Sequence, residues 1–236
     1  MLSAENIRHD LLKLSTPARA KSNAWFFKTG KGEYGEGDVF IGVTVPQVRK
    51  VVKKYIALPL TEIEHLLCSK EHEFRLAALL LLVARFSKAS PQERAQIHEL
   101  YLKRIAWVNN WDLVDSSAEY VVGAYLEGRS KKLLTTLAQS KNLWERRIAI
   151  IATFHDIKRG AYQETFRIAR ILLNDQHDLI HKAVGWMLRE VGKRCGQAVE
   201  EEFLRQHYQA MPRTMLRYAI ERFNPELRKK YLKGTL

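Results

Sequence analysis

The chain has 236 residues, with 39 Lys or Arg against 26 Asp or Glu, which gives a formal net charge of +13. Apolar residues make up 46% and aromatic residues 10%, which excludes a disordered chain, and 12 Gly with 6 Pro exclude collagen-like and low-complexity classes. The longest apolar run, residues 77–84, is too short to span a bilayer. The charge indicates a polyanionic partner, which could be DNA, RNA or a membrane surface.

Signals for targeting and for cysteine chemistry are scarce. Glu5, Arg8 and Asp10 interrupt the start of the sequence, so we see no apolar leader and expect a cytoplasmic protein. Two cysteines, Cys68 and Cys195, are too few and too scattered for a disulfide framework or a zinc cluster.

Helix signals recur along the chain, and the alternation typical of strands is rare. Start signals are, in chain order, Thr16 before Pro17, Thr61 with Glu64, Ser90 before Pro91 with Glu93, and Met211 before Pro212. Apolar residues follow the helical period in 76–83 and 184–191, and we predict about a dozen helices. We expect a single domain over 1–236, with N-terminal helices and a Gly-rich loop in 1–45 and repeats in 46–236.

The helices also repeat. Arg147, Lys182 and Arg217 are 35 residues apart, and Arg75 lies 72 residues before Arg147, which leaves room for one more unit around Asp112. This period is typical of paired helices of the HEAT class. Because stacked pairs bury each other's apolar faces, we predict an all-α fold, a curved α-solenoid of HEAT-like repeats. Its second helices would line a basic concave groove, with Arg147, Lys182 and Arg217 side by side, that suits a nucleic-acid duplex.

A glycine-rich segment, residues 29–45, breaks the pattern. Residues 30–35 satisfy the motif G-x-G-x-x-G, but a dinucleotide site needs a strand before the motif and a helix directly after it. Glu33 and Asp38 would also repel a phosphate. We therefore predict an ordered loop, after which Pro46 restarts a helix.

A histidine pair, His177 and His181, resembles the zinc-peptidase motif H-E-x-x-H, with Asp178 in place of Glu. Two His four residues apart can share a metal ion. No third ligand is evident downstream, however, and Asp is shorter than the Glu that acts as general base. Capping and surface roles are therefore preferred over a metal site.

The segment around Trp111 combines aromatic and acidic residues. If a helix begins near Asp112, that residue caps it and Asp115 falls in the first turn, where the helix dipole keeps a carboxylate ionised. Trp111 and Asp115 are four residues apart and could share a face. The alternative places Trp111 in the core, as we expect for Trp25 and Trp144, with Asp115 bound to backbone amides.

The repeat period brings another tryptophan to the same region. Trp186 follows Lys182 by four residues in a second helix, although a place in the core is the alternative. By the period, Trp111 with Asp115, then Arg147, then Lys182 with Trp186 fall on consecutive second helices and gather on one concave patch. A carboxylate in a groove for polyanions is unfavourable without a function, and catalysis is one such function.

Several blocks of the sequence resemble the AlkD-like family of bacterial DNA alkylation-repair glycosylases, which are built from HEAT-like repeats. The similarity runs through most of the chain. Its blocks are residues 40–43 with Pro46 and Arg49, residues 110–115, residues 143–147 and residues 182–190. Together these blocks are specific, whereas any one of them alone is weak.

The resemblance implies roles for individual residues. The catalytic Asp of the family matches Asp115, its two cleft tryptophans match Trp111 and Trp186, and its cleft Arg matches Arg147. Phe26 falls where the best-known members have a cleft Tyr, which leaves a stacking surface without the hydroxyl. The family excises cationic alkylated purines, such as 3-methyladenine and 7-methylguanine, without flipping the damaged nucleotide into a pocket, unlike most glycosylases.

The implied chemistry agrees with these residue types. Cleavage of the glycosidic bond builds positive charge on the deoxyribose, which tryptophan faces and a carboxylate stabilise. Arg147, Lys182, Arg217 and Phe26 would hold the DNA around the lesion. The resemblance thus implies a monomeric glycosylase, independent of metals and cofactors, that acts on alkylated double-stranded DNA in the nucleoid and not on membranes.

Two other functions remain open. Related proteins that lack the acid bind DNA without excising bases, so a non-catalytic DNA-binding HEAT-repeat protein that recognises damaged or branched DNA would need the groove but not Asp115. A protein-interaction scaffold, the commonest use of helical repeats, would bind with little salt dependence. Six or more phosphate contacts, by contrast, weaken binding roughly a thousandfold between about 50 and 200 mM salt.

Overall fold

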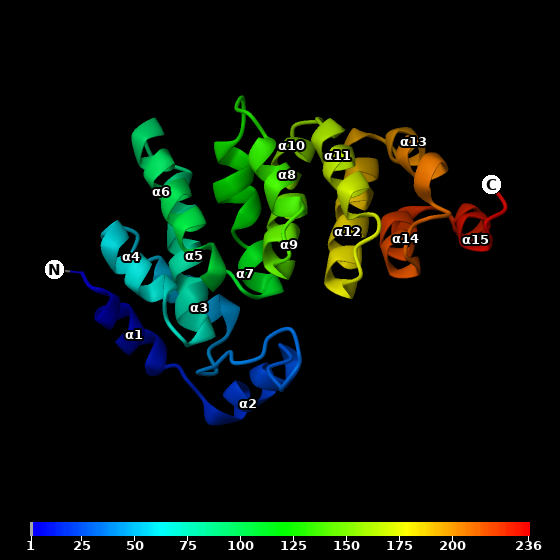
Figure 1. The fold of residues 1–236 in the computed structure, drawn as a ribbon. Helices are drawn as coiled ribbons and strands as arrows, with labels where there is room; N and C mark the ends of the chain where they lie inside the picture. The colour runs from blue at the N-terminus through cyan, green and yellow to red at the C-terminus, as the bar shows by residue number, and fades with distance from the viewer. Residues whose placement is uncertain (1) are drawn as a thin grey trace. The chain divides into compact units, whose positions relative to one another are not determined.

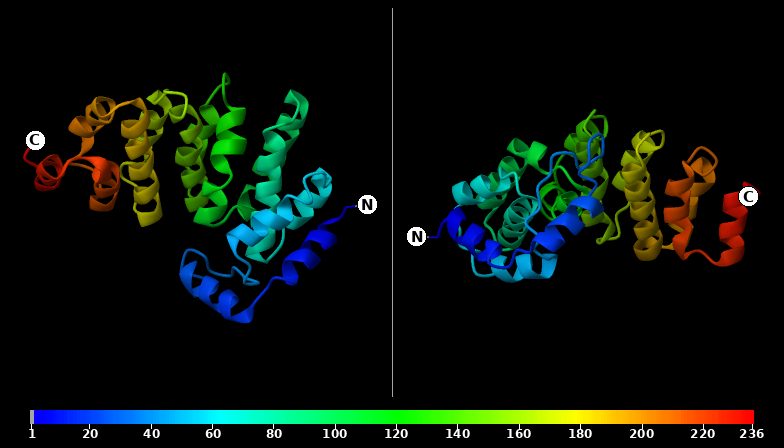
Figure 2. Two further views of the ribbon diagram at one scale, coloured as in Figure 1. Left: turned by 180° about the vertical axis from the view of Figure 1, so that it is seen from behind. Right: turned by 90° about the horizontal axis from the view of Figure 1, so that it is seen from below.

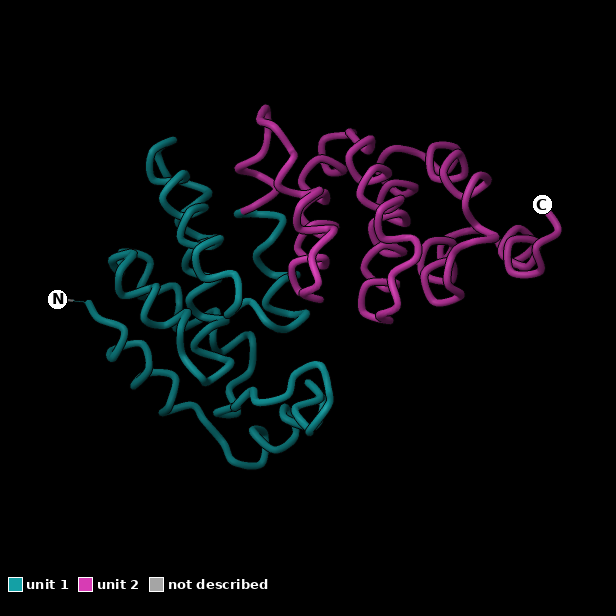
Figure 3. The backbone as a smooth tube through the Cα atoms, in the orientation of Figure 1, with its two compact units in different colours: residues 1–121 teal, residues 122–236 magenta. Residues whose placement is uncertain are grey.

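The structure, a computed structural model, describes residues 2–236 and is all-helical over that range (Figure 1). Among these residues the sole strand-like feature is an isolated bridge between Val39 and Glu71. The chain divides into two compact units, unit 1 up to Val121 and unit 2 from Val122 to Leu236 (Figure 3). No helix of the described range combines the length and apolar character needed to cross a bilayer. The predicted all-α fold is confirmed, and the single domain over 1–236 stays a prediction.

Unit 1 is built around one long helix, α5. Its α-helices are α1 (Ala4–Leu12), α2 (Pro17–Phe26), α3 (Val45–Val52), α4 (Leu60–Leu67), α5 (His72–Phe86), α6 (Pro91–Lys103) and α7 (Trp111–Asp115). Helix α5 contacts α3, α4, α6 and α7. It is buried from His72 to Leu82, because it is apolar on nearly every side and has neighbours around it. Helix α2, by contrast, has no buried residue.

Unit 2 consists of helix pairs. Its α-helices are α8 (Lys132–Ala138), α9 (Leu143–Ala152), α10 (Phe154–Ile157), α11 (Gln163–Leu172), α12 (Asp178–Cys195), α13 (Gln197–His207), α14 (Arg213–Ala219) and α15 (Pro225–Lys233). A short helical turn of another type lies at Ile220–Arg222; the others are Ile105–Trp107 in unit 1 and Glu119–Gly123, which spans the boundary at Val121. Helix α8 packs on α9 and α11 on α12, and the second helices α9, α12 and α14 contact each other in succession (Figure 2). This stacking of helix pairs is the repeat arrangement of an α-solenoid.

The repeat gives equivalent positions in successive second helices. Arg147, Lys182 and Arg217 are each the fifth residue of their helices, α9, α12 and α14. Asp115 is likewise the fifth residue of α7. A carboxylate therefore occupies the position at which the three later second helices carry a cation.

Arg75 corresponds to Arg146 and not to Arg147. The predicted equivalence of Arg75 with Arg147, 72 residues later, was therefore wrong by one residue. Arg75 and Arg146 are each the fourth residue of their helices, α5 and α9. In both, Nη1 donates to the two backbone carbonyls that lie five and six residues earlier, at 2.8 to 3.0 Å. Each guanidinium thus satisfies carbonyls of the turn that joins the two helices of its pair, which is a structural role.

Most predicted helix starts are confirmed. Helices α2 and α6 directly follow Thr16 and Ser90, and α14 directly follows Pro212. Helix α3 begins at Val45, one residue before the predicted Pro46. The predicted cap at Thr61 is wrong, because α4 already begins at Leu60 with no side-chain cap. The partner expected for Thr61, Glu64, instead binds Arg104 at 2.7 Å.

Gly185 allows α12 and α14 to approach each other closely. A Cβ at this position would collide with the carbonyl oxygen of Met215 and with Cβ of Tyr218. We expect Gly185→Ala to lower the free energy of unfolding by about 1–3 kcal/mol through overpacking, despite the better helix propensity of Ala. Urea unfolding followed by circular dichroism measures this, with Lys193→Ala, at an exposed position of α12, as the control. An unchanged midpoint for Gly185→Ala would contradict the close packing.

Candidate functional site

Glu73 anchors the Gly-rich loop, residues 29–45, to α5. Its carboxylate accepts hydrogen bonds from the backbone N–H groups of Ile41, Gly42 and Val43 at 3.0, 2.9 and 3.2 Å. The side-chain amide of Asn23 in α2 donates a further bond at 3.4 Å. Because Glu73 is only 2% exposed, these donors replace the water that its charge loses on burial. The loop is thus held as an ordered segment, as predicted.

Asp38 of the same loop is the centre of a second polar cluster. Its carboxylate accepts from Arg75 at 2.6 Å, from His72 and Asn109 at 3.1 Å each, and from Asn110 at 3.4 Å. Burial alone would raise the pKa of this carboxyl, but the hydrogen bond from His72 and the charge of Arg75 lower it below its ordinary value. Since the donors come from α5 and from the segment before α7, Asp38 joins three parts of unit 1.

His72 extends this cluster into α7. Its Nδ1 lies 3.1 Å from Asp38 and its Nε2 lies 2.9 Å from Asp112. An ionised carboxylate only accepts, so this geometry suits an imidazolium, in which both ring nitrogens donate. Burial opposes this charge, but the charge of Asp112 and the hydrogen bonds to both carboxylates raise the pKa of His72. The ring packs against Phe40 and Phe27, with centroids 4.5 and 5.1 Å away.

Four aromatic side chains pack against this polar network and form a cluster, namely Phe26, Phe27, Phe40 and Trp111. Phe27 stacks on Trp111 and on Phe40, with ring centroids 5.2 and 5.0 Å apart and planes within 19° and 18°. Phe26 meets Trp111 edge-on at 5.9 Å. Phe26 is 54% exposed and Trp111 is partly exposed, so the cluster has an open side. The structure thus brings together two of the predicted site residues, Phe26 and Trp111.

The helix that carries Trp111 and Asp115 begins one residue before the predicted cap. Asn110 caps α7, since its side-chain oxygen accepts from the N–H of Trp111 at 2.9 Å. The predicted cap at Asp112 is wrong, because that carboxylate binds His72 instead. Asp115 is the last residue of this short helix. The helix dipole favours an acidic residue in the first turn and therefore does not explain a carboxylate at this position.

The surroundings of Asp115 combine burial with partial access to solvent. Asp115 is half-buried, whereas Tyr101 beside it is fully buried. Burial raises the pKa of the Tyr101 phenol, and the negative charge of Asp115 adds to the effect. The hydroxyl groups of Tyr101 and Ser117 are hydrogen-bonded at 3.1 Å. A carboxylate next to a buried surface acts on nearby charge more strongly than one in bulk water.

The predicted basic residues of unit 2 differ in exposure. Arg147 is 5% exposed, and its Nη1 donates to the carbonyl of Leu179 at 2.5 Å. The Lys182 side chain is 39% exposed and pairs with Asp178, one turn earlier, at 2.7 Å. Arg217 is exposed. Lys182 and Arg217 therefore present charge at the surface, whereas Arg147 stabilises the first turn of α12.

The tryptophans expected in the core have different environments. Trp144 is 8% exposed, which confirms the prediction for that residue. Trp25 is 74% exposed, and its predicted place in the core is wrong because α2 has no buried face. Trp186 is half-buried and meets Phe154 edge-on at 6.0 Å, so part of its surface remains accessible.

The histidine pair and the glycine motif have the structural roles that were preferred. His177 caps α12, its Nδ1 accepting from a backbone N–H at 3.1 Å, and His181 binds a backbone carbonyl through Nε2. In the glycine motif, the carboxylates of Glu33 and Glu36 accept from two backbone N–H groups at 2.9 Å each, where a phosphate would have to bind. Across residues 2–236, no group of three His, Cys, Asp or Glu residues is arranged to hold a metal ion.

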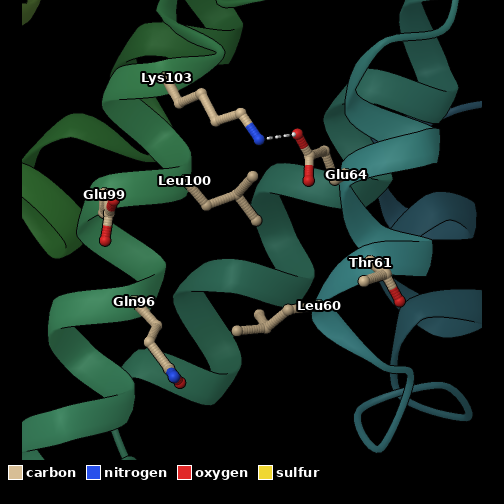
Figure 4. A pocket seen from close by; sticks show the side chains of 7 residues that line it. All are labelled: Leu60, Thr61, Glu64, Gln96, Glu99, Leu100 and Lys103. Carbon is tan, nitrogen blue, oxygen red and sulfur yellow. Dashed lines mark ion pairs between the residues drawn. The ribbon is translucent and has the colours of Figure 1, made fainter.

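A surface cleft of about 270 Å³ in unit 1 lies between α4 and α6 (Figure 4). Its lining residues are Leu60, Thr61, Glu64, Gln96, Glu99, Leu100 and Lys103. Lys103 and Glu64 form an ion pair at 3.0 Å within it. The lining includes none of the residues predicted for the site, so this cleft is not the candidate site.

The polar residues that hold the site together were not predicted. His72 lies 34 residues after Asp38 and 40 residues before Asp112 in the sequence, although it binds both. The one signal in the sequence was Asp38, an acidic residue in a loop of a strongly basic chain. We interpreted it only as a residue that repels phosphate.

Comparisons with known proteins agree with the fold. The sequence profile of a protein family described as DNA alkylation repair enzyme matches residues 7–223. A solved structure described as a predicted DNA alkylation repair enzyme from Enterococcus faecalis is similar, with a TM-score of 0.70 and 19% identity, over 89% of this chain and 97% of that chain. No curated protein matches this sequence.

Proposed function

Because the chain belongs to the family of DNA alkylation repair enzymes, we propose that it is a monofunctional DNA glycosylase. It hydrolyses the N-glycosidic bond of cationic alkylated purines, such as 3-methyladenine and 7-methylguanine, in duplex DNA. The products are the free base and an abasic site. The enzyme works as a monomer in the nucleoid, without a metal or an organic cofactor and without flipping the nucleotide.

The position of Asp115 is the observation that carries this proposal. It stands where the three later second helices carry Arg or Lys, in a chain with a net charge of +13. For DNA binding alone an acid at this position is unfavourable. Catalysis accounts for it, because the reaction builds positive charge that a carboxylate stabilises.

The proposed reaction uses Asp115 and two indoles. The alkylated purine is already cationic, so the electrons of the glycosidic bond move onto the base, which leaves uncharged, while C1′ becomes positive. Asp115 stabilises that charge and accepts a proton from the water whose oxygen attacks C1′. Trp111 and Trp186, which both keep accessible surface, attract the cationic base by about 0.5–2 kcal/mol each.

Other residues hold the DNA. Lys182 and Arg217 bind phosphates without reading sequence. Arg147 supports this contact from within, because its bond to Leu179 fixes the turn of α12 that carries Lys182. Phe26 offers a ring edge-on to Trp111, on which the sugar or base beside the lesion packs.

Base release tests the function directly. We expect the wild-type protein to release 7-methylguanine from methylated duplex DNA, detected by mass spectrometry, and to leave alkali-labile abasic sites. Unmodified duplex should release no base, since a neutral purine is a poor leaving group. If methylated DNA is bound but no base is released, the non-catalytic DNA-binding function replaces this proposal.

A further inference from the structure

Helix α2 carries an exposed aromatic residue that the proposed reaction does not use. Trp25 is 74% exposed, more than any other large apolar side chain recorded as exposed in residues 2–236. Phe26, the next residue, contacts Trp111, so α2 carries a residue of the candidate site as well as Trp25. Trp25 and its neighbour Phe26, which is 54% exposed, together leave aromatic surface open to a partner.

The charge around Trp25 identifies the class of partner. From residue 11 to residue 32 the sequence contains no Asp or Glu, and its basic residues are Lys13, Arg19, Lys21, Lys28 and Lys31. Nζ of Lys28 lies 5.2 Å from the centroid of the Trp25 ring. Lys13 and Lys28 form ion pairs with Asp10 and Glu33, yet the segment keeps an excess of positive charge. A basic segment around an aromatic ring complements a polyanion that also offers flat rings, which is the chemistry of nucleic acid.

The shape of α2 suits a duplex backbone. Ala18, Lys21, Ser22 and Trp25 follow one another at helical spacing and are all exposed, whereas Asn23 on another side of the helix binds Glu73. The small side chains at positions 18 and 22 allow close approach, and Lys21 places a cation one turn before the indole. We call the exposed Ala18, Lys21, Ser22 and Trp25 the α2 face.

We propose that the α2 face binds DNA and that Trp25 stacks on a base exposed where duplex stacking is interrupted. Bases within an intact duplex already stack on each other, so the indole gains a partner only at a gap or an abasic site. The inference rests on the proposed function in one respect, since an abasic site is the product of that reaction. It assigns Trp25 to binding this product and gives it no part in bond cleavage.

Fluorescence anisotropy with two labelled duplexes tests the proposal, one intact and one with a central tetrahydrofuran abasic analogue. Wild type should prefer the abasic duplex. Trp25→Ala should weaken binding to the abasic duplex by about 5- to 100-fold, as for loss of one stacked base, with a much smaller effect on the intact duplex. Trp25→Phe should retain most of the preference, and Lys21→Gln should weaken binding to both duplexes and reduce the salt dependence.

Two controls separate this proposal from its rivals. Leu12→Ala removes another exposed apolar side chain of unit 1 and should bind both duplexes as wild type does. Asp115→Asn, whatever its effect on base release, should keep the Trp25-dependent preference, so failure of the glycosylase proposal leaves this test intact. Equal binding of both duplexes by wild type and Trp25→Ala overturns the inference. Dimerisation or binding to anionic vesicles that Trp25→Ala abolishes, with DNA binding unchanged, also overturns it.

Discussion

Asp115→Asn is expected to release 7-methylguanine from methylated duplex about 100- to 1,000-fold more slowly than wild type, the usual effect of removing one group that stabilises charge in a transition state. The substitution keeps the shape of the side chain and removes its charge and its basicity. Binding of the same DNA should be equal or slightly tighter, because one negative charge disappears from a surface that holds phosphates. Single-turnover kinetics with saturating protein separates the chemical step from binding.

The control for this variant is another acid of unit 1. Asp10→Asn removes a carboxylate of α1 that pairs with Lys54 and Lys13, and it should release base at the wild-type rate. Thermal unfolding of both variants should stay near that of wild type. Wild-type release by Asp115→Asn would remove this residue from the mechanism, whereas slow release with equally weakened DNA binding would indicate a binding role instead.

The helical fold was predictable because its signals are local. A polar cap followed by proline specifies a helix start within a few residues, as at Ser90, and these starts are confirmed. The 35-residue period also gave the equivalent positions of Arg147, Lys182 and Arg217. The assignment of Arg75 failed by one residue, because adjacent arginines at 146 and 147 cannot be distinguished until the carbonyls that they bind are known.

The environment of the candidate site could not be predicted in the same way. Asp112 has the sequence context of an N-cap, yet a histidine 40 residues earlier binds it, and only tertiary structure brings the two together. Trp25 is a large aromatic residue of the kind usually found in a core, yet α2 has no second layer of helices to bury it. Trp111 and Asp115 were identified because their residue types, and not their surroundings, point to the chemistry.

His72→Ala is expected to lower the free energy of unfolding by about 3–5 kcal/mol, the usual cost of removing one partner from a buried ionic network. The side chain of Asp38 is 4% exposed and that of Asp112 is 13% exposed, and both bind His72. Without the imidazolium the two carboxylates lose a shared cation while they stay largely out of water. The damage should be greatest in the Gly-rich loop and in α7, which hydrogen exchange of peptides covering residues 29–45 and 109–116 would resolve.

The pH dependence of stability distinguishes this role from simple packing. The pKa of His72 is raised above its usual 6.5, so its contribution is complete below that pH and is lost as the pH rises through the raised value. The pKa of Asp38 is lowered below its usual 3.8, so its contribution is present above that pH and is lost as the pH falls through the lowered value. Wild type should therefore lose stability on the alkaline side, as measured by urea unfolding from about pH 5 to about pH 9, and His72→Ala should not. His65→Ala, which removes an exposed histidine of α4, should follow the wild-type curve, and an alkaline loss that persists in His72→Ala would assign it to another group.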